Sequence, residues 1–379
     1  MITSIQIQAN SPSKMQIVSE PTPSVKENKF LELTGLNLLD GRFRLLEEVL
    51  GGKSSTCYFG RDENSGTDIF VKLCIFPRSD LERARFKNEI DYLKLNAGFN
   101  EIIKKTPSYI ADGELFDGRI LYLVTERVHG TLLSDWLRAH WSTSDLQQRL
   151  LIAYRVFGAN ENFIHDTAHR DLHVGNIILL PDEIDLYSAT PDFKTIVLDW
   201  GQCYCGVLYQ YSENDDDHMV IIHNGMGKEL TTSFYNLPPE TFQDQEKPNT
   251  GFNKYDSWAM GLLLYKLITG KDLFSFKNIG HYASSLRRIE NIVTSGCFDI
   301  IKAAEQQGGY LLAEILIQLM RSNPSERMSI SKARHALWFI LVEQFYPTER
   351  SEILAFLKNP NYHTGCKWQH YTIEEFDAS

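Results

Sequence analysis

The octapeptide His-Arg-Asp-Leu-His-Val-Gly-Asn occupies residues 169–176, and the tripeptide Asp-Trp-Gly follows at residues 199–201. Together they place two carboxylates and one carboxamide beside short β-type runs. Carboxylate oxygens can accept the proton of a hydroxyl group, and carboxylate and amide oxygens can ligate Mg²⁺. An Asp-x-Gly that follows a strand is usually only a turn, so the specific signal comes from the octapeptide. The two motifs point to magnesium-assisted chemistry on a hydroxyl group.

The bulk composition narrows the class of protein. The chain has 379 residues, 43% of them hydrophobic, which suits one two-lobed catalytic domain with extensions. The formal net charge of −11 argues against a nucleic-acid partner, since phosphate binding depends on clustered Lys and Arg. Six cysteines without an apolar N-terminal segment indicate reduced thiols and an intracellular (cytoplasmic) location. No apolar run approaches the length of a membrane span.

The octapeptide resembles the catalytic loop of the protein-kinase superfamily, because His-Arg-Asp-Leu is followed by Asn five residues after the Asp. The resemblance covers about residues 43 to 345 and implies a bilobal α+β fold, with a small N-lobe of five antiparallel strands and one helix and a larger, mainly helical C-lobe. We expect four parts in chain order: a disordered polar leader at 1–35, the N-lobe at 36–127, the C-lobe at 128–346 and a C-terminal extension at 347–379. The leader suits a linker or regulatory tail, and equally the export signal of a secreted bacterial effector.

Hydrophobic periodicity and capping residues locate the individual elements. Strand-like runs cover residues 43–50, 57–60, 68–75, 109–116 and 120–125. Capping boxes at residues 79–82 and 144–147 open two helices, the first of which we expect to end before Gly98. Further helices are predicted at 258–268, ending at Gly270, and at 310–320 and 330–345.

Lys72 and Glu89 form the first expected contact of the site. Glu89 lies beside the apolar face of the first helix, where a carboxylate needs a cationic partner. Lys72 is the natural partner, because it stands among apolar residues of a strand. The resemblance implies that Lys72 holds the α and β phosphates of ATP and that Glu89 orients it.

The resemblance also assigns roles within the two opening motifs. It implies that Asp171 accepts the proton of the substrate hydroxyl, that Asn176 and Asp199 ligate Mg²⁺, with Mn²⁺ as an alternative, and that His169 and Arg170 brace the loop. Because each of these positions is filled by a matching residue, the sequence favours an active enzyme.

The nucleotide site departs from the family pattern at two places. The glycine-rich loop keeps Gly52 but carries Ser55 where a family glycine would be, so Ser54, Ser55 and backbone amides are the expected phosphate donors. Phe70 replaces the small alanine that roofs adenine, which implies a shifted or wider pocket and leaves the nucleotide preference open. The other residues expected to line the ATP site are Cys57, Lys72, the gatekeeper Thr125, the hinge residues Glu126 and Val128, and Ile178.

Three C-lobe residues resemble those that separate protein kinases from small-molecule kinases. Glu240 matches the glutamate of the Ala-Pro-Glu segment, and Asp256 matches the aspartate that starts a central helix. Arg327 matches the arginine that pairs with that glutamate. The expected reaction is therefore transfer of the γ-phosphate of ATP to Ser or Thr of a protein substrate.

His173 keeps alternatives open, because it replaces the lysine typical of Ser/Thr kinases and resembles the loops of small-molecule kinases. Its imidazole could reach the γ-phosphate, partly charged at neutral pH, or simply pack within the loop. One alternative is thus a kinase for a small-molecule hydroxyl substrate. A second, favoured by Phe70 and the degenerate glycine loop, is a nucleotide-binding pseudokinase scaffold. The sequence carries no signal for the oligomeric state.

The long segment between Asp199 and Glu240 contains an acidic run, Asp215 to Asp217. Such a run is usually a solvated loop. The sharper hypothesis is that it replaces an activating phosphate by pairing with Arg170. Phosphorylation at residues 231–235 is the alternative route to activation.

Overall fold

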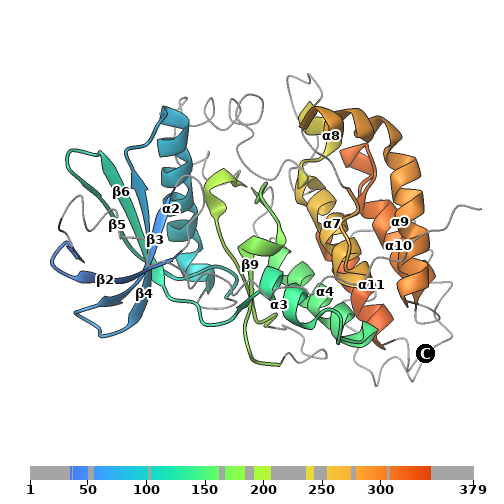
Figure 1. Ribbon diagram of the computed structural model, residues 1–379, viewed down its shortest axis with the longest axis horizontal. Coiled ribbons are helices and arrows are strands. Elements are labelled where there is room, and N and C mark those ends of the chain that lie inside the picture. The colour runs from blue at the N-terminus through green and yellow to red at the C-terminus, as the bar shows by residue number, and fades with distance from the viewer. Residues whose placement is uncertain are drawn as a thin grey trace, which may run out of the picture.

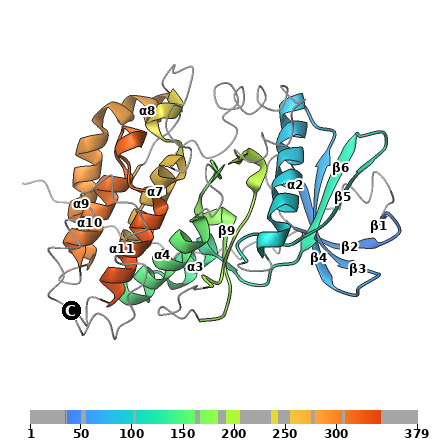
Figure 2. The same cartoon turned by 180° about the vertical axis from the view of Figure 1, so that it is seen from behind.

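The computed structural model describes residues 35, 37–49, 55–100, 104–161, 167–183, 192–205, 236–242, 254–274, 279–304 and 308–342. The leader up to residue 34, the acidic run, residues 231–235 and the C-terminal extension lie outside these ranges. The described residues form two lobes, a curled sheet with one long helix and a bundle of helices (Figure 1). The same division is visible from behind (Figure 2). The bilobal α+β fold expected from the sequence is confirmed.

The N-lobe sheet is antiparallel and has the strand order β1-β2-β3-β4-β6-β5. Its strands are β1 (Leu38–Leu39), β2 (Phe43–Val49), β3 (Thr56–Asp62), β4 (Asp68–Ile75), β5 (Tyr109–Leu115) and β6 (Ile120–Glu126). The expectation of five strands was therefore one too low. The additional strand β1 has two residues, which is too short to show the alternation that marks a strand in a sequence.

Alternation along β4 separates the core of this lobe from the site. Ile69, Val71 and Leu73 are buried in one apolar cluster with residues of the neighbouring strands. Successive side chains of a strand point to opposite faces. Phe70 and Lys72 therefore share the other face of β4, which is turned to the rest of the molecule.

Helix α2 (Asp80–Asn100) lies along the sheet and begins where the sequence predicts. The backbone N–H of Glu82 donates to Ser79 Oγ at 3.2 Å, while the Glu82 carboxylate accepts from the backbone N–H of Arg78 at 2.6 Å. Gly98 does not end the helix, contrary to the prediction. A glycine stops a helix by adopting positive φ, and Gly98 is not among the positive-φ glycines of the described residues.

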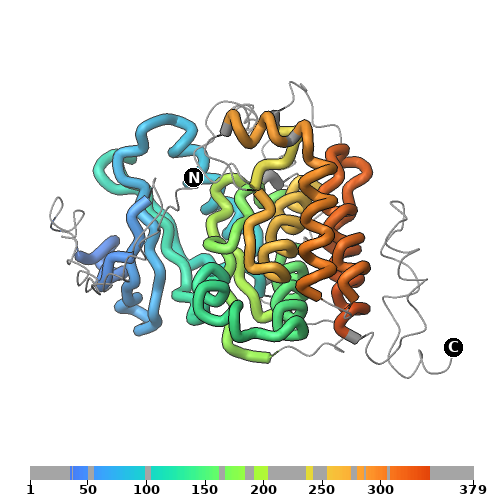
Figure 3. Tube along the Cα trace, turned by 45° about the vertical axis from the view of Figure 1, so that its right-hand side comes forward, coloured from blue at the N-terminus to red at the C-terminus, as the bar shows by residue number. Residues whose placement is uncertain are grey.

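The C-lobe helices are α3 (Leu133–His140), α4 (Leu146–Asn160), α7 (Tyr255–Thr269), α8 (Ile279–Ser285), α9 (Ile289–Ala304), α10 (Gly309–Leu319) and α11 (Ile330–Val342). Helix α7 is apolar on nearly all sides and is buried, as predicted. It ends at Gly270 with φ of 73°. Helices α9, α10 and α11 lie together at the end far from the sheet (Figure 3). None of the described helices is long and apolar enough to cross a membrane.

The N-terminus of α4 differs from the prediction by one residue. Asp145 is the N-cap, with Gln148 N–H donating to its Oδ1 at 2.8 Å and its own N–H donating to Gln148 Oε1 at 3.2 Å. Ser144, the predicted cap, instead donates through Oγ to the carbonyl oxygen of Trp141 at 2.8 Å. Both residue types cap helices equally well, so this competing local contact of Ser144 decides between them.

The side chain of Lys105 connects the N-lobe to the end of α4, and its buried amine makes the stability of the protein depend on pH. Its Nζ donates to the carbonyl oxygen of Glu161 at 2.5 Å, and burial lowers the pKa of this amine to about 7. In the unfolded chain the pKa returns toward 10.5. Between about pH 7 and 10.5 the unfolded state binds more protons than the folded state, so the free energy of unfolding rises with pH. Relative to K105M, we expect the wild type to gain about 2–3 kcal/mol between about pH 7.5 and 9.5 in urea unfolding. Parallel pH profiles of the two proteins would contradict the assignment.

Candidate active site

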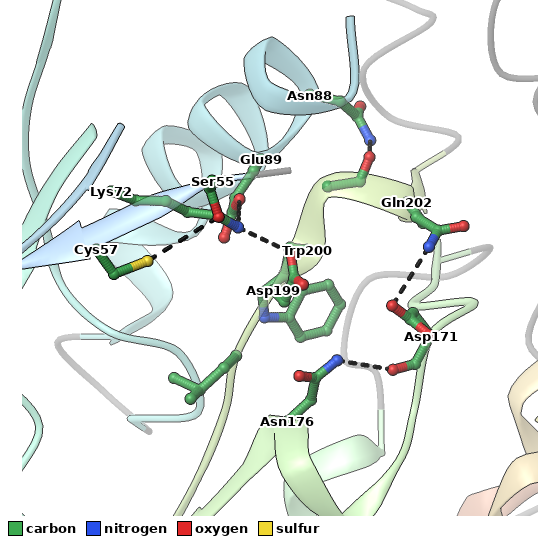
Figure 4. Close-up of polar contacts among 12 residues, drawn as sticks. Ser55, Cys57, Lys72, Asn88, Glu89, Asp171, Asn176, Asp199, Trp200 and Gln202 are labelled. Atoms are coloured by element: carbon green, nitrogen blue, oxygen red, sulfur yellow. Dashed lines mark hydrogen bonds and ion pairs between the residues drawn. The ribbon is translucent and has the colours of Figure 1, made fainter. Parts of the chain in front are cut away.

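Lys72 lies at the centre of the candidate site, between two carboxylates. Its Nζ is 2.6 Å from Glu89 Oε2 on helix α2 and 2.9 Å from Asp199 Oδ1 (Figure 4). The ion pair expected between Lys72 and Glu89 is thus present, and both side chains are largely shielded from solvent. Helix α2 and the segment that begins at Asp199 therefore meet at one cation.

Burial and charge act against each other in this triad. Burial alone lowers the pKa of Lys72, but the charges of Asp199 and Glu89 outweigh it and raise that pKa above its ordinary value. The Lys72 cation holds the pKa of the Asp199 carboxyl below its usual range. Burial raises the pKa of Glu89, an effect that Lys72 opposes. At neutral pH the site therefore contains a charged lysine beside an ionised Asp199.

The buried Asp256 at the start of α7 holds the backbone of residues 169–176, which we call the catalytic loop. Its carboxylate accepts from the backbone N–H groups of His169 at 2.6 Å and Arg170 at 2.9 Å. Burial raises the pKa of Asp256 to about 6. Arg170 has φ of 67°, a left-handed conformation that is uncommon for a residue with a side chain. The two hydrogen bonds keep the loop in this conformation.

His169 joins the catalytic loop to the segment before Asp199. Its Nδ1 accepts from the backbone N–H of Asp171 at 3.2 Å, so Nε2 carries the proton and donates to the carbonyl oxygen of Leu198 at 2.8 Å. Burial lowers the pKa of His169 to about 4, in keeping with this neutral tautomer. His169 is therefore a neutral bridge between the two motifs.

Asp171, Asn176 and Asp199 come together on one side of this bridge. Asn176 Nδ2 donates to the backbone oxygen of Asp171 at 2.9 Å, and the backbone N–H of Leu198 donates to the backbone oxygen of Asn176 at 2.8 Å. The Asn176 amide oxygen faces away from Asp171 (Figure 4). Asp199 has φ of 60°. The buried carboxylate of Asp171 thus lies beside two further side-chain oxygens that could bind a metal ion, those of Asn176 and Asp199.

Asp199 and Asn176 have the chemistry of a Mg²⁺ site that is completed by phosphate. Both supply hard oxygen ligands, which Mg²⁺ prefers. Within the described ranges no three His, Cys, Asp or Glu side chains converge as a metal cluster. Mg²⁺ commonly binds through one or two protein oxygens together with substrate phosphates, and these two donors fit that arrangement.

His173 packs within the catalytic loop through one ring nitrogen. Its Nδ1 accepts from the backbone N–H of Gly175 at 3.0 Å. Burial lowers the pKa of His173, against the opposing effect of Asp199. Nδ1 is therefore engaged within the loop, and burial shifts the ring toward its neutral form. A neutral ring that accepts at Nδ1 carries its proton at Nε2.

Three of the residues expected at the nucleotide site lie on the Lys72 face of the sheet. Cys57 on β3 stands opposite Lys72, and Phe70 stands opposite Thr125 on β6. The Phe70 ring meets the Phe59 ring edge-on, with centroids 6.2 Å apart. Phe70 therefore lies on the same face of the sheet as Lys72, Cys57 and Thr125.

The remaining residues expected at the nucleotide site are described in part. Ser55 Oγ is 4.0 Å from Cys57 Sγ. The Glu126 carboxylate accepts from the backbone N–H of Ser108 at 3.1 Å, and the Glu126 backbone N–H donates to the backbone oxygen of Ser108 at 3.0 Å. Its carbonyl oxygen accepts from Thr125 Oγ1 at 3.2 Å. Val128 follows β6, and Ile178 on β9 (Ile177–Leu179) pairs with Leu132 on β7 (Thr131–Leu132). Gly52 and Ser54 lie outside the described residues.

The expected C-lobe ion pair is present as a bidentate contact. Arg327 Nη1 and Nη2 lie 2.9 Å from Glu240 Oε1 and Oε2, respectively. Arg327 is 1% exposed and also donates to the backbone oxygens of Arg321 at 3.0 Å and Lys254 at 2.9 Å. The segment that contains Glu240 is thereby fastened to the body of the lobe.

Two polar residues of the site were missed by sequence reasoning. Gln202 donates from Nε2 to Asp171 Oδ2 at 3.3 Å (Figure 4). Asn88 on α2 donates to the backbone oxygens of Gly201 and Cys203, on both sides of Gln202. A polar Asn beside Glu89 on the apolar side of a helix is the one signal that could have drawn attention to this contact. Its partners are more than a hundred residues away in sequence.

A lysine of the sheet paired with a glutamate of helix α2, facing a loop with Asp and Asn, defines a phosphotransferase of the kinase fold. The profile of the family described as "Protein kinase domain" matches residues 43–339 of the chain. The chain belongs to the protein kinase domain family and carries the domain of a phosphotransferase.

Three curated relatives share low identity with the chain. A probable serine/threonine-protein kinase of Dictyostelium discoideum is 23% identical over 59% of this chain and 22% of its own length. A serine/threonine-protein kinase of Phytophthora infestans is 20% identical over 80% of this chain and 72% of its own. One of Schizosaccharomyces pombe is 22% identical over 84% of this chain and 63% of its own. The chain thus spans less than two thirds of the first and third relatives.

Proposed function

We propose that the chain transfers the γ-phosphate of ATP, with Mg²⁺, to Ser or Thr hydroxyls of a protein substrate. The observation that carries this proposal is the contact of Lys72 with both Glu89 and Asp199. The names of the relatives support Ser and Thr as acceptors. Phosphoryl transfer depends mainly on positioning and on charge stabilisation, and this arrangement of charges supplies both.

Each charged residue then has one task. Lys72 binds the α and β phosphates, and Glu89 keeps its ammonium group in place. Asp171 orients the acceptor hydroxyl and accepts its proton. Mg²⁺, when bound between Asp199, Asn176 and the phosphate oxygens, would neutralise charge on the transferred group. Asp256 holds the backbone of the catalytic loop so that these groups keep their relative positions.

The C-lobe contacts favour a protein acceptor. Asn236 Nδ2 donates to the backbone oxygen of Leu172 at 3.0 Å, and Tyr282 donates through its hydroxyl to the backbone oxygen of Leu237 at 2.6 Å. With the pair of Glu240 and Arg327, these bonds hold residues 236–242 beside the catalytic loop. A fixed backbone next to Asp171 gives an extended peptide a surface on which to lie.

A turnover assay distinguishes this proposal from its two rivals. The purified chain is incubated with γ-labelled ATP and Mg²⁺, alone and with a mixed Ser/Thr peptide library, and Mn²⁺ and a chelator are compared. We expect label on Ser or Thr, and its loss on chelation. Turnover only after addition of a metabolite extract would favour the small-molecule kinase, for which His173 is the supporting residue. Nucleotide binding without turnover would favour the pseudokinase, for which Phe70 is the supporting residue.

A further inference from the structure

Gln202 touches the proposed catalytic base. It is the last residue of a short 3₁₀ helix, η2 (Trp200–Gln202), and lies three positions after Asp199. Its Nε2 donates to Asp171 Oδ2 at 3.3 Å (Figure 4). The segment that supplies a proposed metal ligand therefore also contacts the carboxylate that is proposed to accept the proton. Sequence reasoning assigned Gln202 no role.

Asn88 fixes the backbone on both sides of Gln202. This buried residue of α2, which is 5% exposed, donates from Nδ2 to the backbone oxygens of Gly201 at 3.2 Å and Cys203 at 2.8 Å. A primary amide nitrogen has two hydrogens, so it can serve both carbonyl groups. The position of Gln202 is therefore set by α2, the helix that also carries Glu89.

Two further contacts keep the same segment against α2. The rings of Tyr92 and Trp200 are stacked, with centroids 4.1 Å apart and planes at 15°. A Cβ atom at Gly201 would lie 3.1 Å from the backbone oxygen of Arg85, so the absence of a side chain allows the backbones to approach closely. Residues 200–203 are thus packed on the helix over their whole length.

We propose that Gln202 is a positioning residue for the Asp171 carboxylate and that Asn88 acts through it. A hydrogen bond to one carboxylate oxygen sets the rotation of the group, and with it the direction in which the second oxygen meets the acceptor hydroxyl. Helix α2 then aligns two parts of the site at once, Lys72 through Glu89 and Asp171 through Asn88 and Gln202. The inference rests on the proposed phosphoryl transfer.

The test compares Q202M with a matched control. Methionine has a similar volume to glutamine but cannot donate. We expect Q202M to lower kcat about tenfold with KM for ATP and the melting temperature unchanged, since a small misplacement of a reacting group affects the chemical step. The control is Q318M, because the side chain of the buried Gln318 donates to Glu314 on its own helix, away from the site. Q318M should keep the kcat of the wild type.

Asn88 is tested in a double-mutant cycle. N88L should lower kcat, and in the double variant with Q202M the two losses should not multiply, because Asn88 acts through Gln202. N96L is the control, since Asn96 is buried on α2 and donates to the backbone oxygen of Tyr92 on the same helix. An unchanged kcat in Q202M, or losses in the double variant that multiply fully, would overturn the inference. The proposed function would still stand in that case, because the wild type turns over. No turnover in the wild type would overturn both.

Discussion

Replacement of Asp171 by asparagine is expected to leave the protein folded and nearly inactive. Asparagine has the same shape and keeps an oxygen that can accept from Gln202, but it cannot take the proton of the acceptor hydroxyl. Loss of one such group costs about 3–4 kcal/mol of barrier, which corresponds to a fall in kcat of about two to three orders of magnitude. The measurement is kcat for transfer from γ-labelled ATP.

The melting temperature of this variant should match that of the wild type, which separates a chemical from a structural defect. D135N is a suitable control, because Asp135 lies on α3 and is about half exposed. It should retain full turnover. Full turnover in D171N would remove Asp171 as the base.

Replacement of Arg327 by methionine is expected to produce the largest loss of stability. Arg327 is 1% exposed and holds Glu240 through two hydrogen bonds of 2.9 Å. Methionine would leave the glutamate without its counterion and would also remove the donors to Arg321 and Lys254. Breaking a buried ion pair from one side costs about 3–5 kcal/mol. The free energy of unfolding in urea measures this loss.

An exposed pair provides the comparison for Arg327. Arg138 lies 3.4 Å from Asp135, and its side chain is 80% exposed. Exposed ion pairs contribute little, so R138M should change stability by less than about 0.5 kcal/mol. A loss in R327M as small as that in R138M would show that the buried pair does not stabilise the C-lobe.

Local patterns predicted most of the elements because their signals lie within a few residues. The apolar run of α7 with Gly270 at its end, the cap at Ser79 and the alternation along β4 each depend on neighbouring residues alone. The pair of Lys72 and Glu89 was also accessible, since a carboxylate beside an apolar helix face requires a cation nearby. These features need no knowledge of distant parts of the chain.

The predictions that failed depend on competing side-chain contacts, on very short elements or on residues that meet only in the folded chain. Asp145 rather than Ser144 caps α4 because Ser144 donates to Trp141. Strand β1 consists of two residues and takes its conformation from pairing with β2. Gln202 contacts Asp171 only after the two motifs have folded together. No pattern of neighbouring residues therefore predicts this contact.

The most direct test of the central claim is to map the phosphate that leaves ATP. The wild type and D171N are incubated with isotope-labelled ATP and Mg²⁺, and mass spectrometry locates the label on the chain and on added peptides. We expect label on Ser or Thr residues with the wild type, in proportion to the ADP formed, and almost none with D171N. ADP formation without phosphorylated Ser or Thr, or equal labelling by both proteins, would contradict it.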